Sequence, residues 1–267
     1  SRRSLPLIMA AVVQRFRVNI LGVGISAINL EHAVEDVERW IVDREMRYVN
    51  VCTVHTVMEC RKDDRLRHVV NGSGLSTPDG MPLVWLSRLY GYREAGRVYG
   101  PDLMLALCER SQSTGHRHFF YGGAPGVADL LTRTLNTRFP GLVVAGTHSP
   151  PYRPADTDED GRVLDIINAT APDIVWVGLG TPKQDYWVAR HRGRLSAPVL
   201  IAVGAAFDFH AGLVRQAPRW MQRSGLEWVF RLLQEPRRLA YRYLVYNPLF
   251  VFNVTLQLTG LRTYRLD

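Results

Sequence analysis

The stretch His118-Phe-Phe-Tyr-Gly-Gly-Ala-Pro-Gly126 decides the fold of this chain. Four residues typical of a buried strand run into a glycine-rich loop, and residues 127–138 then have the apolar spacing of a helix. The same unit returns as a strand at 173–177, a loop at 178–182 and a helix through Trp187 and Val188. Successive strand–loop–helix units predict an α/β, Rossmann-like fold with a mainly parallel sheet and helices on both faces.

The remaining apolar runs extend this pattern in both directions. Strands are expected at 18–25, 48–53, 75–77, 142–146 and 198–203, and helices at 30–42, 57–70, 81–90 and 103–112. Together they predict one Rossmann-like domain over residues 17–216. Ligands of such sheets bind beyond the carboxyl ends of the strands, so residues that directly follow a strand are the candidates for function.

The composition points to an anionic partner. The 267-residue chain is 46% hydrophobic and carries a formal net charge of +8. Of its 33 basic residues only Lys62 and Lys183 are lysine. Arginine favours planar, bidentate partners such as phosphate and carboxylate. Charge alone does not separate a nucleotide, a nucleic acid and a lipid phosphate.

Two further features bear on the compartment. The cysteines, Cys52, Cys60 and Cys108, are odd in number and have no Cys-x-x-Cys spacing, which favours a reducing compartment over a disulfide framework or a zinc site. The apolar run at 5–13 is shorter than the about 20 residues that span a bilayer. It also has no clear small-residue cleavage site, so we do not expect a signal peptide there.

The last fifth of the chain, residues 217–267, has a different character. From 215 to 267, nine arginines stand against three acidic residues, a net charge of +6. The apolar, tyrosine-rich run at 244–258 contains Pro248, which argues against a transmembrane helix. Basic residues beside aromatic ones fit a segment that lies on an anionic membrane surface. The alternative is a C-terminal helix packed on the domain with a solvated basic face.

The turn Thr77-Pro-Asp-Gly-Met-Pro82 presents one carboxylate, Asp79, after a predicted strand. Pro78 and Gly80 favour a β-turn. The conservative interpretation is that Asp79 caps the following helix. The functional interpretation is that its carboxylate faces the ligand-binding edge of the sheet.

Other candidates also follow strands. Loop N–H groups at Gly122, Gly123, Gly178 and Gly180 are in the context that holds phosphate, although ordinary loop glycines explain them equally well. His55 and Gln184 are expected at the same edge, where a histidine can bind a ligand or move a proton. Thr181 and Pro182 predict the N-cap and first residue of a helix. Motifs for a catalytic nucleophile are absent from the sequence.

The run Asp156-Thr-Asp-Glu-Asp-Gly161 has the look of a metal motif. However, the twelfth position of a calcium loop starting there is Ile167, where a bidentate carboxylate is needed. A helix-starting loop explains the acidic residues, since they favour the positive end of a helix. We therefore expect no metal at this run.

Eight stretches together resemble the WecG/TagA/CpsF glycosyltransferase family (glycosyltransferase family 26), in the order of that family and over about residues 20–250. The matching stretches are Thr77-Pro-Asp-Gly-Met-Pro82, Arg97-Val-Tyr-Gly-Pro-Asp-Leu-Met104, Tyr121-Gly-Gly-Ala-Pro-Gly-Val127, Gly178-Leu-Gly-Thr-Pro-Lys-Gln-Asp185, Val203-Gly-Ala-Ala-Phe-Asp208, Ala217-Pro-Arg-Trp-Met-Gln-Arg223, Gly225-Leu-Glu-Trp228 and Arg231-Leu-Leu-Gln-Glu-Pro-Arg-Arg238.

The resemblance implies an inverting transferase, without a metal or other cofactor, that moves a sugar from a UDP-sugar to a polyprenyl-diphosphate-linked saccharide. Such enzymes work peripherally on the cytoplasmic face of the bacterial inner membrane, in exopolysaccharide and cell-surface glycan biosynthesis, and a homo-oligomer is an option. The resemblance also implies that residues 217–267 associate with the membrane and close the active site.

Site residues are implied by the same match. Asp79 corresponds to the candidate catalytic base of the family, and Thr53, Arg97 and Gln184 correspond to further catalytic positions. The implied substrate-binding residues are the four loop glycines together with Lys183, Asp208, Arg237, Arg238 and Arg242, of which the last three resemble groups that close over the donor diphosphate.

One departure leaves the donor sugar open. Family members that use N-acetylmannosamine typically have Thr-x-Asn after the second strand, whereas this chain has Thr53-Val-His55. Transfer of glucose onto a lipid-linked glucose is therefore an alternative to transfer of N-acetylmannosamine, and His55 is a candidate site residue.

Two other classes of function are considered. A nicotinamide-dependent oxidoreductase would use the same sheet, but the full Gly-x-Gly-x-x-Gly fingerprint is absent from the sequence. A nucleic-acid-binding module would use the basic charge, but that charge gathers beside an apolar tail, which suits a membrane better. We therefore expect no nucleic-acid partner.

Overall fold

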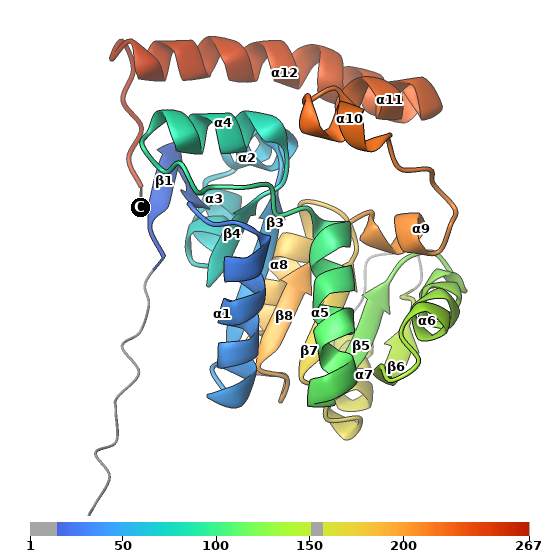
Figure 1. Cartoon of the computed structure of the whole chain (residues 1–267). Coiled ribbons are helices and arrows are strands. Elements are labelled where there is room, and N and C mark those ends of the chain that lie inside the picture. The colour runs from blue at the N-terminus through green and yellow to red at the C-terminus, as the bar shows by residue number, and fades with distance from the viewer. Residues whose placement is uncertain (1–14, 151–156, 267) are drawn as a thin grey trace, which may run out of the picture.

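A six-stranded parallel sheet forms the centre of the molecule (Figure 1). The structure, a computed structural model, describes residues 15–150 and 157–266. The sheet order is β4-β3-β8-β7-β5-β6. Its strands, all paired in parallel, are β3 (Arg47–Cys52), β4 (Leu75–Pro78), β5 (Arg117–Gly122), β6 (Val143–His148), β7 (Ile174–Gly178) and β8 (Val199–Ala202). The α/β, Rossmann-like prediction is confirmed.

Helices cover both faces of this sheet. One face packs against α1 (Leu30–Val42), α5 (Gly100–Thr114), α6 (Val127–Arg138) and α9 (Ala206–His210). The other face packs against α3 (Asp64–Asn71), α7 (Thr157–Ala169) and α8 (Lys183–His191). Alternate strand residues supply the two cores: Phe120 lies in the first, and Phe119 and Tyr121 lie in the second. Burial on both faces explains why the central strands are continuous apolar runs.

The expected strand at 18–25 is wrong as a single element. The chain forms a hairpin of β1 (Arg17–Ile20) and β2 (Val23–Ser26), which is a two-stranded antiparallel sheet of its own. The two turn residues, Leu21 and Gly22, have φ of 54° and 88°. Positive φ at both central residues is the requirement of the tight turn that matches strand twist, and Gly22 makes it accessible.

Two helices lie between β3 and β4 in the chain, and a third follows β4. The helical pattern expected at 57–70 is divided into α2 (Val54–Cys60) and α3 because Asp63 starts a new helix. The Asp63 carboxylate accepts hydrogen bonds from the N–H groups of Arg65 and Leu66 at 2.9 and 3.2 Å. The turn after β4 leads into α4 (Met81–Leu89).

The C-terminal part is helical and basic, as expected. It consists of α10 (Arg219–Arg223), α11 (Glu227–Gln234) and α12 (Pro236–Leu258), and α12 runs across α2 and α4 at the top of Figure 1. Tyr246 and Phe250 bury their rings among residues of the hairpin and α2. Pro248 lies inside α12 without ending it. No helix within 15–150 and 157–266 combines the length and the apolar character needed to cross a bilayer.

The far end of α12 is fastened to the hairpin. Gln257 donates from its side-chain amide to the Asn19 carbonyl at 2.8 Å and accepts from the Leu21 N–H at 2.9 Å. The Asn19 side chain donates to the carbonyl of Tyr264 at 2.7 Å. Segments from the two ends of the described chain therefore support one another.

Candidate active site

The sheet brings most predicted site residues to one edge. Thr53 follows β3, Asp79 follows β4, and Gly122 and Gly178 end β5 and β7. Neighbouring strands are about 4.8 Å apart, so about 14 Å separates the end of β4 from the end of β7 across β3 and β8. This edge therefore suits an extended ligand that lies across several strands.

Asp79 does not cap the following helix, so that interpretation was wrong. Gly80 occupies the N-cap position of α4. The backbone N–H of Asp79 donates to the Cys52 carbonyl at 2.8 Å, which ties the turn to the neighbouring strand. Its carboxylate instead accepts from Arg97, at 3.0 Å from Nη2 and 3.2 Å from Nε.

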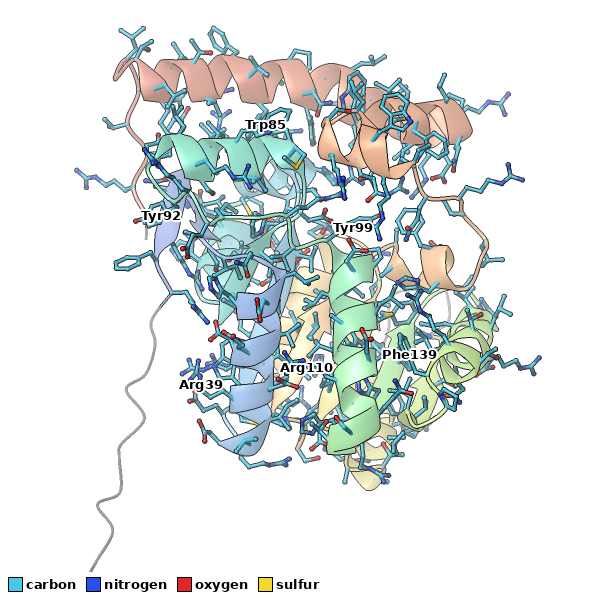
Figure 2. The ribbon with its side chains drawn as sticks, viewed as in Figure 1. Arg39, Trp85, Tyr92, Tyr99, Arg110 and Phe139 are labelled. Atoms are coloured by element: carbon cyan, nitrogen blue, oxygen red, sulfur yellow. The ribbon has the colours of Figure 1, made fainter. Side chains whose placement is uncertain are left out.

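Arg97 is shared between two carboxylates. Its Nη2 also donates to Oε2 of Glu227 at 2.6 Å. The guanidinium lies 4.0 Å from the centre of the Tyr99 ring, and the Tyr99 hydroxyl donates to the other Glu227 oxygen at 3.1 Å. Tyr99 stands just above α5, directly below α10 and α11 (Figure 2). The C-terminal segment thus contributes a side chain to the surroundings of Asp79.

The electrostatics of this group favour a base at neutral pH. Burial raises the pKa of Asp79 to about 6; Arg97 opposes this rise, and the Glu227 and Asp102 carboxylates add to it. Burial alone would lower the pKa of Arg97, but Asp79 and Glu227 together raise it above its usual range. At pH 7 Asp79 is then mainly ionised, yet it holds a proton more readily than an ordinary aspartate.

His55 lies in the first turn of α2, beside α12. Burial, together with the nearby Arg242 and Lys62 cations, lowers its pKa to about 3, so the imidazole is neutral near pH 7. Its ring centre is 5.5 Å from that of Tyr246. Arg242 is mostly buried and interacts electrostatically with both His55 and Asp79, so it is the predicted C-terminal arginine that the fold brings to the site.

Two of the predicted catalytic residues have clear structural roles. Thr53 is the N-cap of α2, where its hydroxyl accepts from the Thr56 N–H at 3.3 Å. Gln184 is buried in α8, and its side-chain oxygen accepts from the Gly180 N–H at 3.0 Å. The helix begins at Lys183 with Pro182 at the N-cap, so the predicted Thr181–Pro182 cap is displaced by one residue. Lys183 itself is exposed in the first turn.

The glycine loops touch each other. The Gly123 N–H donates to the Gly178 carbonyl at 3.0 Å, and a Cβ on Gly122 would lie 2.5 Å from that same oxygen. Gly178 in turn is against the Phe207 ring, 2.9 Å from where its own Cβ would be. The N–H groups of Gly123 and Gly180 are therefore engaged within the protein, and a phosphate at these loops would have to use other atoms.

The remaining binding candidates lie at the start of α12 and in α9. Arg237 is exposed, and Arg238 forms an ion pair with Glu235. Asp208 is half-buried in α9, where burial raises its pKa and the nearby Arg238 opposes that rise. Neither Arg237 nor Arg238 is placed against Asp79 by the contacts of the described residues.

Several residues near this end of the sheet are not predicted from the sequence to be site residues. Tyr99 and Glu227 lie in stretches that match the family, but nothing in their spacing indicates a common partner. Asp185 is buried and accepts from the Asn50 amide at 2.7 Å, and burial raises its pKa to about 6. Among the described residues, the buried Nε atoms of Arg231 and Arg242 have no hydrogen-bond partner.

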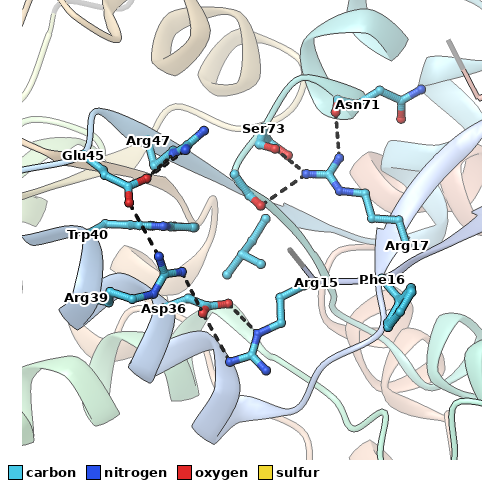
Figure 3. Close-up of a pocket in the computed structure, with 12 residues that line it drawn as sticks. Arg15, Phe16, Arg17, Asp36, Arg39, Trp40, Glu45, Arg47, Asn71 and Ser73 are labelled. Carbon is cyan, nitrogen blue, oxygen red and sulfur yellow. Dashed lines mark hydrogen bonds and ion pairs between the residues drawn. The ribbon is translucent and has the colours of Figure 1, made fainter. Parts of the chain in front are cut away.

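A cavity of about 740 Å³ lies elsewhere, at the amino ends of β3 and β4 (Figure 3). Its arginines are engaged: Arg15 binds Asp36 at 2.8 Å, Arg39 binds Asp36 at 3.2 Å, and Arg47 binds Glu45 at 2.8 Å. Arg17 donates to the carbonyls of Asn71, Ser73 and Gly74. None of the predicted site residues lines this cavity.

The acidic run at 156–161 is helical from Thr157 onward, in α7, while Asp156 lies outside the described residues. The apolar run at 5–13 also lies outside them. Among the residues that the structure describes, there is no group of three or more His, Cys, Asp or Glu side chains arranged to hold a metal ion.

Comparison with known proteins identifies the family. The profile of the Glycosyl transferase WecG/TagA/CpsF family matches residues 18–264. The chain belongs to this family of glycosyltransferases.

Curated relatives agree with this assignment. A Bacillus spizizenii protein is 32% identical over 180 residues, which are 67% of this chain and 68% of that protein. A Bacillus subtilis protein is 29% identical over 79% of this chain and 80% of its own length. A Staphylococcus aureus protein is 23% identical over 89% of this chain and 92% of its own length. All three are named N-acetylglucosaminyldiphosphoundecaprenol N-acetyl-beta-D-mannosaminyltransferase.

Proposed function

We propose that the protein is an inverting hexosyltransferase that moves a sugar from a UDP-sugar to a polyprenyl-diphosphate-linked saccharide, with Asp79 as the general base. The observation that carries this proposal is the Asp79 carboxylate, which is only 12% exposed at the ligand-binding edge of a glycosyltransferase-family fold. Three relatives are named for a lipid-diphosphate acceptor and a β-linked product. A β product from an α-linked nucleotide sugar requires inversion at the anomeric carbon.

In the proposed reaction, an acceptor hydroxyl attacks the anomeric carbon from the face opposite UDP. Asp79 takes the hydroxyl proton, the new carbon–oxygen bond forms, and the bond to the diphosphate oxygen breaks with its electron pair leaving on UDP. General-base help of this kind contributes about 10²–10⁴ in rate. The raised pKa of Asp79 suits this task, because it combines ionisation at neutral pH with a stronger affinity for the proton.

The leaving diphosphate needs positive charge, and the C-terminal helices supply it. Arg242 is largely buried near Asp79, and burial lowers its pKa because the charge lacks full solvation there. A diphosphate would satisfy the unpartnered Nε of Arg242 and of Arg231 through charge-assisted hydrogen bonds. We propose Arg242 and Arg231 for this contact, with Arg237, Arg238, Lys183 and the loops at Gly122 and Gly178 extending it.

We further propose that residues 217–267 lie on the anionic cytoplasmic face of the membrane. The outer side of α12 exposes large apolar side chains beside its arginines. They are Tyr241, Leu244, Leu249, Val251, Phe252 and Leu258. Phe252→Ser is expected to weaken binding to vesicles that contain anionic lipid by several-fold without changing UDP affinity. Equal vesicle binding by both proteins would refute this orientation.

The donor sugar is proposed to be of the N-acetylmannosamine or the glucose type. The named relatives support the first. The neutral, half-buried His55 at this end of the sheet supports a difference in sugar recognition, because its imidazole offers other hydrogen-bonding atoms than an asparagine amide.

The function is tested by UDP release from UDP-N-acetylmannosamine, UDP-glucose and UDP-N-acetylglucosamine, each with short-chain polyprenyl-diphosphate-linked N-acetylglucosamine or glucose. We expect release that depends on the acceptor, and a β-configured product by NMR. An α-configured product would overturn the inverting mechanism. Absence of acceptor-dependent release with every pair would overturn the proposed substrate class.

A further inference from the structure

Glu227 of the C-terminal segment contacts Arg97, which in turn contacts the proposed base. Nη2 of Arg97 donates to Asp79 at 3.0 Å and to Glu227 at 2.6 Å, and the shorter contact is the one to Glu227. Arg97, Asp79 and Glu227 are 15%, 12% and 16% exposed, so water screens these contacts poorly. One guanidinium therefore divides its attraction between a carboxylate of the Rossmann-like part and a carboxylate of α11.

Glu227 is held firmly in this place. Its Oε1 accepts from the Tyr99 hydroxyl at 3.1 Å, and it lies in the first turn of α11, where the helix dipole favours a carboxylate. The preceding Gly225 has φ of 74° and is seated on Trp85 of α4, where a Cβ would lie 2.8 Å from the ring. The start of α11 is thus fixed against α4 while its glutamate points to Arg97.

The charged groups around Asp79 come from several elements. Arg97 precedes α5, Asp102 is in α5, Glu227 is in α11 and Arg242 is in α12. The Cys52 thiol and the Tyr99 hydroxyl also lie within electrostatic reach of Asp79, and burial keeps both protonated. Nε and Nη2 of Arg97 both donate to Oδ1 of Asp79, and without Glu227 the guanidinium would no longer share Nη2 with a second carboxylate.

We propose that Glu227 is a positioning residue: when residues 217–267 dock, it draws the Arg97 guanidinium partly away from Asp79 and so leaves that carboxylate free to accept the proton of the acceptor. Docking of the C-terminal segment then both covers the site and prepares its base. The inference rests on the proposed function, because it assigns a purpose to the Asp79 carboxylate as base.

The test uses full-length protein and direct titration of Asp79 by carbon NMR of 13C-labelled aspartate, with UDP present as the probe ligand. The Asp79→Asn variant identifies the signal. In Glu227→Gln we expect the titration midpoint of Asp79 to move to lower pH by about one unit, since a like charge is removed and Arg97 turns to Asp79. In Glu227→Asp, which keeps the charge, the midpoint is expected to stay near that of the wild type.

Turnover provides the second readout. In Glu227→Gln the acid limb of the pH profile of kcat/KM is expected to move in the same direction, and kcat at neutral pH to fall by about three- to tenfold as the base weakens. Tyr99→Phe, a milder change that only frees Glu227 from its hydroxyl partner, is expected to shift the same midpoint by a smaller amount. An unchanged Asp79 midpoint in both Glu227→Gln and Tyr99→Phe would overturn the inference.

The two proposals fail in distinguishable ways. If Asp79→Asn retains turnover, the base assignment is wrong, whatever the NMR midpoints show. If Asp79→Asn is inactive but Glu227→Gln lowers kcat with no movement of the midpoint or the acid limb, Asp79 remains the base and Glu227 only fastens the segment.

Discussion

Arginines are paired differently at the two ends of the sheet strands, which are called here the amino edge and the carboxyl edge. At the amino edge, Arg15 and Arg39 converge on Asp36, and Arg47 has Glu45 (Figure 3). At the carboxyl ends of the strands, Arg97 bridges Asp79 and Glu227, while the guanidinium of Arg242 lies 5.8 Å from the centre of the Tyr243 ring. At the amino edge, two arginines pair with one carboxylate, Asp36. At the carboxyl edge, one arginine is shared by two carboxylates, Asp79 and Glu227. Under the proposed function, this difference separates charges that support the fold from charges that take part in the reaction.

The largest expected contrast is between Asp79→Asn and Asp36→Asn. Asp79→Asn is expected to lower kcat by about 10²–10⁴ while leaving UDP affinity nearly unchanged. Asp36 is 3% exposed and serves two arginines, so Asp36→Asn is expected to cost about 2–4 kcal/mol of unfolding free energy and to leave kcat intact where the protein is folded. Steady-state kinetics and urea unfolding measure the two effects. A similar kcat for both variants would erase the contrast.

The next contrast concerns the arginines themselves. Arg97→Gln removes the cation that opposes the rise in the pKa of Asp79, so the acid limb of the kcat/KM profile is expected to move to higher pH. This direction is opposite to that expected for Glu227→Gln. Arg39→Gln, which loses a contact at the amino edge, is the matched control and should leave the profile in place. A shift to lower pH in Arg97→Gln would contradict the charge assignment.

The smallest contrast lies in stability against pH. Burial raises the folded-state pKa of Asp79 to about 6, whereas an unfolded aspartate titrates near 3.9. Between these values the folded state binds more protons, so the contribution of Asp79 to stability falls as pH rises from about 4 to about 6. The free energy of unfolding of Asp79→Asn, relative to that of the wild type, should therefore rise by about 1–3 kcal/mol from pH 4 to pH 7.5. Urea unfolding at the two pH values would show it, and a constant difference would contradict it.

The parallel sheet is predictable because its signals are local. The strands at 118–122 and 174–178 are apolar, end in glycine and precede helices, and they form adjacent strands. The hairpin at 17–26 escapes prediction because a leucine with positive φ is uncommon and only Gly22 hints at the turn. The division between α2 and α3 depends on one capping aspartate, Asp63, in the charged stretch 61–65 between two apolar groups of helical spacing.

The candidate site is predictable in part. Position after a strand brings Asp79 to the right edge, and the family resemblance supplies Arg97. The partner Glu227 is 130 residues from Arg97, and no periodicity relates two side chains at that separation. Thr53 and Gln184 also show that a position can match a family motif and at the same time hold a helix start or a loop in place.

The fastening of α12 limits how substrates enter. The helix before it, α11, is held by the ion pair of Glu227 with Arg97. The far end of α12 is held to the hairpin by the hydrogen bonds of Gln257. The α11–α12 segment is therefore held to the rest of the protein at both ends and does not move about a single hinge. Under the proposed function, a lipid-linked acceptor would have to enter beside α12. Rotation of the whole segment away from the sheet would require the Glu227 and Gln257 contacts to break together.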